Sequence, residues 1–229
     1  MEFRGEEVPL GPPQTRVVLA MLAAHANDVV TIDGIAEELW GSSPPASAKT
    51  QVHGIISALR RLLGRDRITT TRPRGYRLLA RPDELESHLF RNDVECAREM
   101  LAEGAVAAGA ARLRRALARW RGPVLAELRG HLGRGLDETH VLALEERIAA
   151  DLQLGRGADL VGELVELVAE HPLRERFRAQ LMTALAHTGR LAEASRAYSV
   201  YRTTMVRELG VEPSAGLRAL HTRILRGNS

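Results

Sequence analysis

The sequence has little of several things that other classes of protein need. Cys96 is the only cysteine among 229 residues, which excludes an intrachain disulfide and a cysteine-based zinc site. Aromatic residues make up only 3%, so a core must be built from leucine, alanine and valine, which favours helices. No apolar run approaches the ~18 residues of a membrane span, and the N-terminal stretch lacks the apolar centre of a signal peptide. We therefore expect a cytoplasmic protein without a membrane partner.

Motifs for catalysis and for cofactors are also missing. The eight histidines are scattered, and the sequence holds no GxSxG, HExxH or glycine-rich dinucleotide loop. The stretch GSSPPASAKT at 41–50 is only faintly similar to a phosphate-binding loop, because Ala48 stands where that motif needs a glycine before Lys49. We expect no enzyme activity and no cofactor.

Charge is distributed very unevenly along the chain. Residues 1–47 hold two basic and seven acidic residues, and residues 82–229 hold 21 of each. Residues 48–81 hold nine basic residues and only one acidic residue, a net charge of +8 that outweighs the whole chain's +3. Such a concentration favours binding to a polyanion, whereas the alternative interpretation is an ordinary solvated surface.

The basic stretch has a pattern that suits a DNA duplex. Its first half, SAKTQVHGIISALRRLLG, predicts a helix with Val52, Ile56, Leu59 and Leu63 in one apolar stripe, widened by Ile55 and Leu62. The opposite face is basic and hydrogen-bonding. The second half predicts a hairpin, with strands at 68–71 and 76–79 and turn residues at 72–75. The helix fits a major groove, and the arginine-tipped turn can reach the adjacent backbone or minor groove.

Gly54 is unusual inside the predicted helix, since glycine there costs roughly 1 kcal/mol relative to alanine. It is either a tolerated substitution or a point where the helix approaches DNA closely.

The segments before this stretch complete a domain. Val8 and Leu10 indicate a short extended segment, and Gly11-Pro12-Pro13 a turn. Residues 14–26 predict a helix, and Thr31 is placed to cap a second helix that runs to Trp40. Ser42-Ser43-Pro44-Pro45 predicts a loop, because two prolines cannot continue a helix. The order is strand, helix, helix, loop, helix, hairpin, which is the order of a winged helix.

Several motifs resemble a known DNA-binding domain. The domain is that of OmpR-type regulators, in the version found in the SARP (Streptomyces antibiotic regulatory protein) family, where a longer N-terminal sheet usually precedes the first turn. The motifs that carry the resemblance are Leu10-Gly11-Pro12-Pro13, Leu39-Trp40-Gly41, Gln51-Val52-His53, Leu59-Arg60-Arg61-Leu62-Leu63-Gly64 and Arg74-Gly75-Tyr76-Arg77-Leu78.

The remaining residues predict an array of helices. Apolar periodicity indicates helices near 84–103, 110–120, 137–154, 159–170, 174–187, 191–208 and 214–226. Ala194 and Tyr198 match the small-x3-aromatic step of a tetratricopeptide (TPR) repeat, which favours stacked helix pairs with a protein-binding surface. This part resembles the bacterial transcriptional activation domain (BTAD) of SARPs, on motifs that include Trp120-Arg121-Gly122-Pro123, Leu144-Glu145-Glu146-Arg147, His171-Pro172-Leu173-Arg174 and Leu209-Gly210-Val211-Glu212-Pro213.

The predicted fold is therefore mainly α. An N-terminal winged helix-turn-helix domain with short strands and a wing hairpin occupies residues 1–81, and an all-α, TPR-like array occupies residues 82–229. The resemblance implies that the base edges or flanking phosphates are contacted by Thr50, His53, Ser57 and Arg60, the DNA backbone by Arg61, Arg65 and Arg67, and the minor groove by Arg72 and Arg74. We expect Lys49 to be a further DNA-binding residue. If Arg60 reads a guanine, Arg60→Ala costs about 1–3 kcal/mol at one base pair.

The resemblance implies a sequence-specific transcriptional activator of a secondary-metabolite (antibiotic) gene cluster, associated with the nucleoid. It implies binding to direct repeats as a homodimer on DNA and recruitment of RNA polymerase holoenzyme, including sigma, with Ser42, Ser43, Pro44 and Pro45 as candidate polymerase contacts. Two alternatives stay open. One is a protein-interaction adaptor based on the helical array, and the other is the N-terminal part of a larger ATPase-containing regulator.

Overall fold

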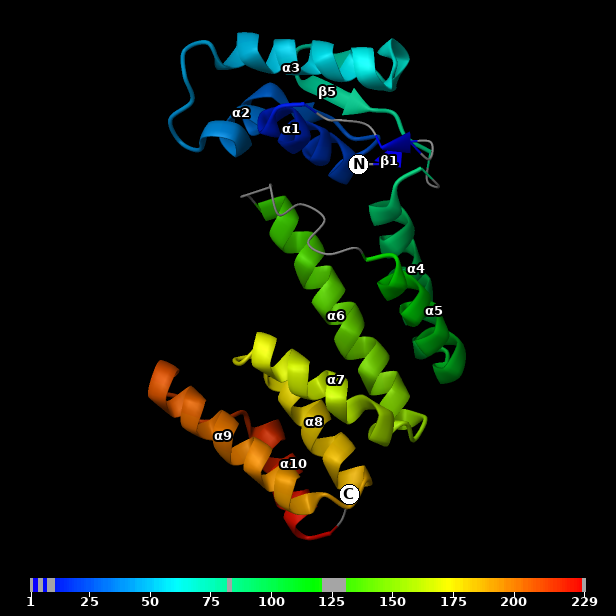
Figure 1. Cartoon of the computed structure of the whole chain (residues 1–229), viewed down its shortest axis with the longest axis vertical. Helices are drawn as coiled ribbons and strands as arrows, with labels where there is room; N and C mark the ends of the chain where they lie inside the picture. Colours follow the sequence, from blue (N-terminus) through cyan, green and yellow to red (C-terminus); the bar gives the residue numbers. More distant parts are fainter. Residues whose placement is uncertain (1, 4–5, 8–10, 82–83, 121–130, 228–229) are drawn as a thin grey trace. The chain divides into compact units, whose positions relative to one another are not determined.

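A computed structural model describes residues 2–3, 6–7, 11–81, 84–120 and 131–227 (Figure 1). The chain divides into two compact units, one of residues 1–92 with 118–140 and the other of residues 93–117 with 141–229. Helices α4 (Glu86–Ala102) and α6 (His131–Gln153) therefore each contribute to both units. Two features of the sequence, the extended segment at Val8 and Leu10 and the last three residues of the motif Trp120-Arg121-Gly122-Pro123, lie outside the described residues.

Three helices form most of the first unit: α1 (Pro13–Ala24), α2 (Ile32–Trp40) and α3 (Ala48–Leu63). Helix α1 begins at a proline, which suits a first turn because its missing N–H would have no helical partner. Helix α2 is capped as the sequence predicted, since the Thr31 hydroxyl accepts a hydrogen bond from the Gly34 N–H at 3.0 Å. Helix α3 ends at Gly64, which has a φ of +104°.

The wing is part of a three-stranded antiparallel sheet with the order β3-β5-β4. Strands β4 (Ile68–Thr71) and β5 (Gly75–Leu78) form the predicted hairpin, in a register that pairs Ile68 with Leu78 and Thr70 with Tyr76. A short 3-10 helix, η1 (Arg65–Arg67), leads into β4. Strand β3 (Val30–Thr31) pairs with β5 and was not expected from the sequence. A second sheet pairs β1 (Glu2–Phe3) with β2 (Glu6–Glu7).

The core of the first unit holds the apolar stripe of α3 against α1, α2 and the sheet. Val52, Ile56 and Leu59 are buried with partners that include Val18 and Leu22 of α1. Ile55 and Leu63 pack at the edge of this core. The prediction that Leu62 joins the stripe is wrong, because its side chain is 37% exposed. Burying one face of α3 in this way turns its opposite face outward.

The second unit is built from helices that mostly match the predicted ranges. They are α4, α5 (Val106–Ala118), α6, α7 (Gly157–Glu170), α8 (Glu175–His187), α9 (Leu191–Leu209) and α10 (Ala215–Leu225). Helix α5 begins four residues before its predicted start and α6 six residues before. After Val106 the first turns of α5 contain only alanine and glycine, so they carry no pattern of large apolar residues from which a start could be predicted.

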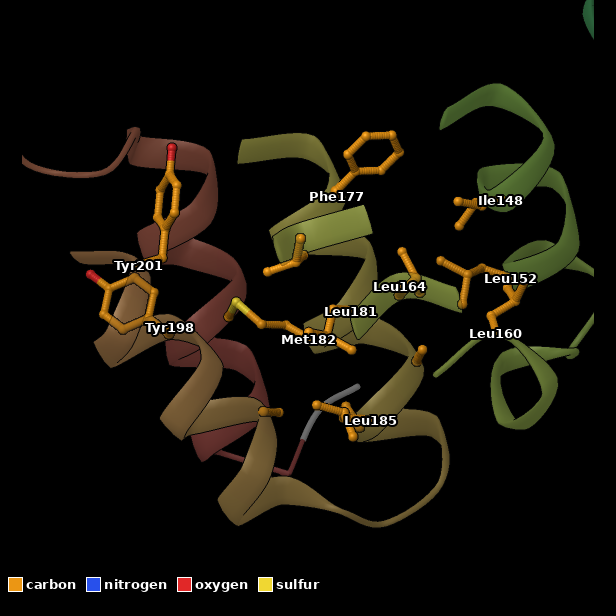
Figure 2. Packing of buried hydrophobic residues seen from close by; sticks show 14 of the residues in the cluster. Ile148, Leu152, Leu160, Leu164, Phe177, Leu181, Met182, Leu185, Tyr198 and Tyr201 are labelled. Carbon is orange, nitrogen blue, oxygen red and sulfur yellow. The ribbon is translucent and has the colours of Figure 1, made fainter. Parts of the chain in front are cut away.

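Consecutive helices pack as neighbours, α7 on α8, α8 on α9 and α9 on α10. Their core includes Leu164, Phe177, Met182 and Tyr201, and Figure 2 shows these and related side chains filling the space between the helices. Ala194 and Tyr198 of the predicted TPR step are both buried in it. The prediction of a mainly α fold, a winged helix followed by a TPR-like helical array, is confirmed.

Two buried carboxylates on α6 hold arginines from neighbouring segments of the second unit. Asp151 is 3% exposed and pairs with Arg114 of α5, Arg147 of α6 and Arg156 before α7. Glu145 is equally buried and accepts from Arg174 Nε at 2.7 Å. Charges this deeply buried are tolerated only when they are paired, so these contacts fix how the helices pack.

Among the described residues, no helix has the length and apolarity that crossing a membrane requires. No group of three or more histidine, cysteine, aspartate or glutamate side chains in the same residues could hold a metal ion.

Candidate nucleic-acid interface

The outward face of α3 carries the side chains that the sequence assigned to DNA. Lys49, Thr50, His53, Ser57 and Arg61 are all exposed. Thr50, His53 and Ser57 offer hydrogen-bonding groups along the middle of this face. Lys49 and Arg61 place positive charge near its two ends. The Ser57 hydroxyl donates to the His53 carbonyl at 2.8 Å, which leaves its oxygen lone pairs to accept from a partner.

A hollow of about 340 Å³ lies between this face and the wing. Helix α3 forms one wall and the hairpin the other, and the two are next to each other in Figure 1. Its lining is rich in hydroxyl, imidazole and guanidinium groups, which suit a phosphate or a base edge. The lining residues are Ile32, His53, Ser57, Arg60, Thr70, Thr71, Arg72, Pro73, Gly75 and Tyr76.

Arg60 uses its guanidinium group to join α3 to the wing. Its Nε donates to the Ile68 carbonyl at 2.9 Å, and a terminal nitrogen donates to the Thr70 hydroxyl at 2.7 Å. The guanidinium also lies 5.7 Å from the centre of the Tyr76 ring, within cation–π range. The side chain is half-buried, and these contacts use two of its five N–H donors within the protein. Sequence reasoning assigned Arg60 to DNA, and the structure places it in the lining of the hollow.

Tyr76 is a residue of the hollow that sequence reasoning missed. It is buried, and the His53 ring meets it edge-on with 6.3 Å between ring centres. Burial raises the pKa of its hydroxyl, so the ring stays neutral near pH 7. The register pairs Tyr76 with Thr70, and side chains paired across two strands face the same side, so both line the hollow. The predicted strand bounds, 68–71 and 76–79, did not indicate this register.

Arg67 is engaged within the protein. Its two terminal nitrogens each donate to a Glu84 oxygen at 2.7 Å, and one also donates to the Leu79 carbonyl at 3.1 Å. The hydrogen bonds from Arg67 and from the Arg81 N–H lower the pKa of the Glu84 carboxyl to about 2. This bidentate pair joins the end of η1 to the segment that follows the wing.

The other arginines that the sequence assigned to DNA are exposed to solvent. Arg65, Arg72 and Arg74 are exposed, and Arg72 also lines the hollow. The Ser42, Ser43, Pro44 and Pro45 loop before α3 is exposed throughout. Five exposed cations therefore lie on α3, just after it and at the tip of the wing, and we call them the cationic surface: Lys49, Arg61, Arg65, Arg72 and Arg74.

Comparison with known protein families places both parts of the chain. The family described as "Transcriptional regulatory protein, C terminal" matches residues 5–78, and the family described as "Bacterial transcriptional activator domain" matches residues 85–225. The cationic surface lies entirely within the first match.

Similar proteins cover nearly the whole chain. Regulatory protein DnrI of Streptomyces peucetius is 37% identical over 228 residues, which cover 93% of this chain and 84% of DnrI. Transcriptional regulatory protein EmbR of Mycobacterium tuberculosis is 36% identical over 236 residues, which cover 99% of this chain. The chain spans only about three fifths (61%) of EmbR.

A solved structure agrees with these matches. Mycobacterium tuberculosis EmbR, in a complex with a low-affinity phosphopeptide, superposes with a TM-score of 0.90 at 35% identity, covering 98% of this chain and 62% of that one. With a winged helix that carries an exposed cationic surface, a TPR-like array after it, and relatives of this kind, the chain belongs to the SARP family of transcriptional activators, built from an OmpR-type domain and a BTAD.

Proposed function

We propose that this protein binds double-stranded DNA through the cationic surface, with α3 in the major groove and the tip of the wing at the adjacent minor groove. The observation that carries the proposal is the cationic surface itself. Its five basic side chains are exposed on α3, just after α3 and at the tip of the wing, and one of them, Arg72, lines the hollow between the helix and the hairpin. That arrangement suits duplex DNA, a polyanion whose major groove is wide enough to admit an α-helix.

We further propose that the DNA sites are direct repeats near the promoters of a secondary-metabolite gene cluster. Two copies then bind head to tail as a homodimer on DNA, because a direct repeat presents the same half-site twice in one orientation. The second unit and the exposed loop at 42–45 contact RNA polymerase holoenzyme, including its sigma subunit. Activation follows from binding alone, since DNA and polymerase are held at a high effective concentration by one protein.

The experiment that tests this function is selection of random duplexes by the purified protein, repeated over a salt series. Enrichment of paired direct repeats, with affinity falling steeply as salt rises, is the expected result. Recovery of no preferred sequence contradicts the proposal and favours the protein-interaction adaptor. Tight binding without a salt dependence contradicts the role of the cationic surface.

Arg72→Ala is expected to weaken binding to every sequence by a similar factor, because Arg72 at the tip of the wing contributes positive charge near the phosphates that flank the minor groove and does not read a particular base. The slope of log affinity against log salt should become shallower by about 1, the contribution of one phosphate contact. The measurement is a salt titration on one selected duplex and one random duplex. Arg226→Ala, which removes an exposed arginine of the second unit, is the matched control and should leave the slope unchanged.

Arg60→Ala separates two roles for that side chain. Because Arg60 is hydrogen-bonded to Ile68 and Thr70, we propose that it positions the wing rather than reading a base. Its loss should then lower affinity for all sequences and destabilise the first unit by about 1–2 kcal/mol, the size of one or two hydrogen bonds. The base preferences of the variant, measured by the same selection, should match those of the wild type. A preference lost at one base pair alone would restore the role in base reading.

A further inference from the structure

Gly54 lies in the middle of α3 and is exposed on the face that carries Thr50, His53 and Ser57. Glycine weakens a helix interior relative to alanine, because it has more backbone freedom to lose on folding. Glycine at such a position is explained within the protein only if close packing leaves no room for a β-carbon.

At other glycines of this protein, packing does exclude a β-carbon. A β-carbon at Gly109 of α5 would come within 2.7 Å of the Leu101 side chain, and one at Gly75 would come within 2.0 Å of the Val30 carbonyl oxygen. A β-carbon at Gly54 would meet nothing within 4 Å among the described residues. The fold of the described residues therefore places no steric demand on Gly54.

We infer that Gly54 is a specificity-determining residue, the point at which the α3 backbone comes closest to the base edges of the bound duplex. This inference rests on the proposed DNA binding. The neighbouring Thr50 and Ser57 have short side chains, so their hydroxyls reach base edges only if the helix axis lies deep in the groove. A β-carbon at Gly54 would meet the base edges before the helix reached this depth. The hydroxyls of Thr50 and Ser57 would then stay too far from the bases to form hydrogen bonds.

The test compares Gly54→Ala with a control from another helix. Gly162 of α7 is also an exposed mid-helix glycine whose β-carbon would meet no described atom within 4 Å. Both Gly54→Ala and Gly162→Ala should raise Tm by about 2–4 °C, since both remove the same helix penalty. Affinity is then measured on a duplex enriched by the wild-type protein and on a random duplex.

Gly54→Ala should lose about tenfold or more on the enriched duplex, the size of one mismatched base pair. On random DNA the loss should stay below about twofold, because phosphate contacts carry non-specific binding. Gly162→Ala should bind both duplexes like the wild type. Gly54→Ser, with a larger side chain, should lose more on the enriched duplex than Gly54→Ala.

The outcomes separate the inference from the function on which it rests. If the wild type enriches no sequence, the proposed DNA binding fails. If the wild type enriches a site and Gly54→Ala binds that site equally well, the inference is overturned and the function stands. A Gly54→Ala protein that loses affinity together with Tm also overturns it, because the helix itself is then damaged.

Discussion

Gly75→Ala is expected to destabilise the first unit by about 3 kcal/mol or more, through a steric collision together with backbone strain. Gly75 begins β5, the middle strand of the sheet, with a φ of +152°. Its β-carbon would lie 2.0 Å from the Val30 carbonyl oxygen and 2.8 Å from the Thr31 Cα, both of them backbone atoms of β3. Backbone cannot turn aside as a side chain can, so the variant must separate β3 from β5 or distort the hairpin.

Urea unfolding followed by tryptophan fluorescence measures this effect, since Trp40 packs against the core of the first unit. Gly64→Ala is the control for backbone strain. Gly64 has a φ of +104°, but a β-carbon there would meet only the flexible Arg67 Cγ at 3.9 Å. Gly64→Ala should therefore cost clearly less than Gly75→Ala. Equal losses for the two variants would show that the contact with β3 contributes nothing beyond conformational strain.

Asp151→Ala should destabilise the second unit by about 3 kcal/mol, because it leaves buried positive charge without its carboxylate. The Arg147 side chain is only 9% exposed, and after the substitution Glu163 is its one remaining ion-pair partner among the residues that the structure describes. Arg114 and Arg156 are 39% and 48% exposed, so they can turn toward water, and this keeps the expected loss at the low end for a broken buried pair.

Urea unfolding followed by far-ultraviolet circular dichroism tests the expectation for Asp151. Glu166→Ala removes an exposed carboxylate from α7 and is expected to change the free energy of unfolding by less than about 0.5 kcal/mol. A loss for Asp151→Ala as small as that of the control would mean that water replaces the carboxylate at little cost. The buried cluster would then be a consequence of how the helices pack and would have no part in fixing it.

Local patterns in the sequence were enough to predict the elements that carry the candidate interface. The period of Val52, Ile56 and Leu59 defined both the buried and the exposed face of α3, and Gly64 marked its end. The turn residues at 72–75 located the tip of the wing. These features depend on residues that are only a few positions apart in the chain, so they can be predicted from one sequence without knowledge of the fold.

Contacts between distant residues could not be predicted in the same way. Strand β3 is two residues long and exists because β5 pairs with it, and the partner of Val30 is Tyr76, 46 residues later in the sequence. The partners of Arg67 and Arg60 depend likewise on where η1 and the hairpin meet other segments. As a result, a count of arginines overstates the charge that is available to a ligand, and the structure distinguishes the five cations of the cationic surface from those with partners inside the protein.

The hydrogen bonds of Arg60 also bear on whether the sheet can recruit a foreign strand. Strand β4 is an edge of its sheet, and the Arg67 carbonyl just before it accepts from the Leu79 N–H beside β5. Successive carbonyls of a strand point to opposite sides, so the Ile68 carbonyl faces the open edge, where Arg60 occupies it. The other edge, β3, offers only two residues. When molecules of this protein are crowded together, the β4 edge is therefore partly blocked by Arg60 and the β3 edge is too short to pair with much of a foreign strand. Natural sheets use blocked and short edges to avoid edge-to-edge aggregation.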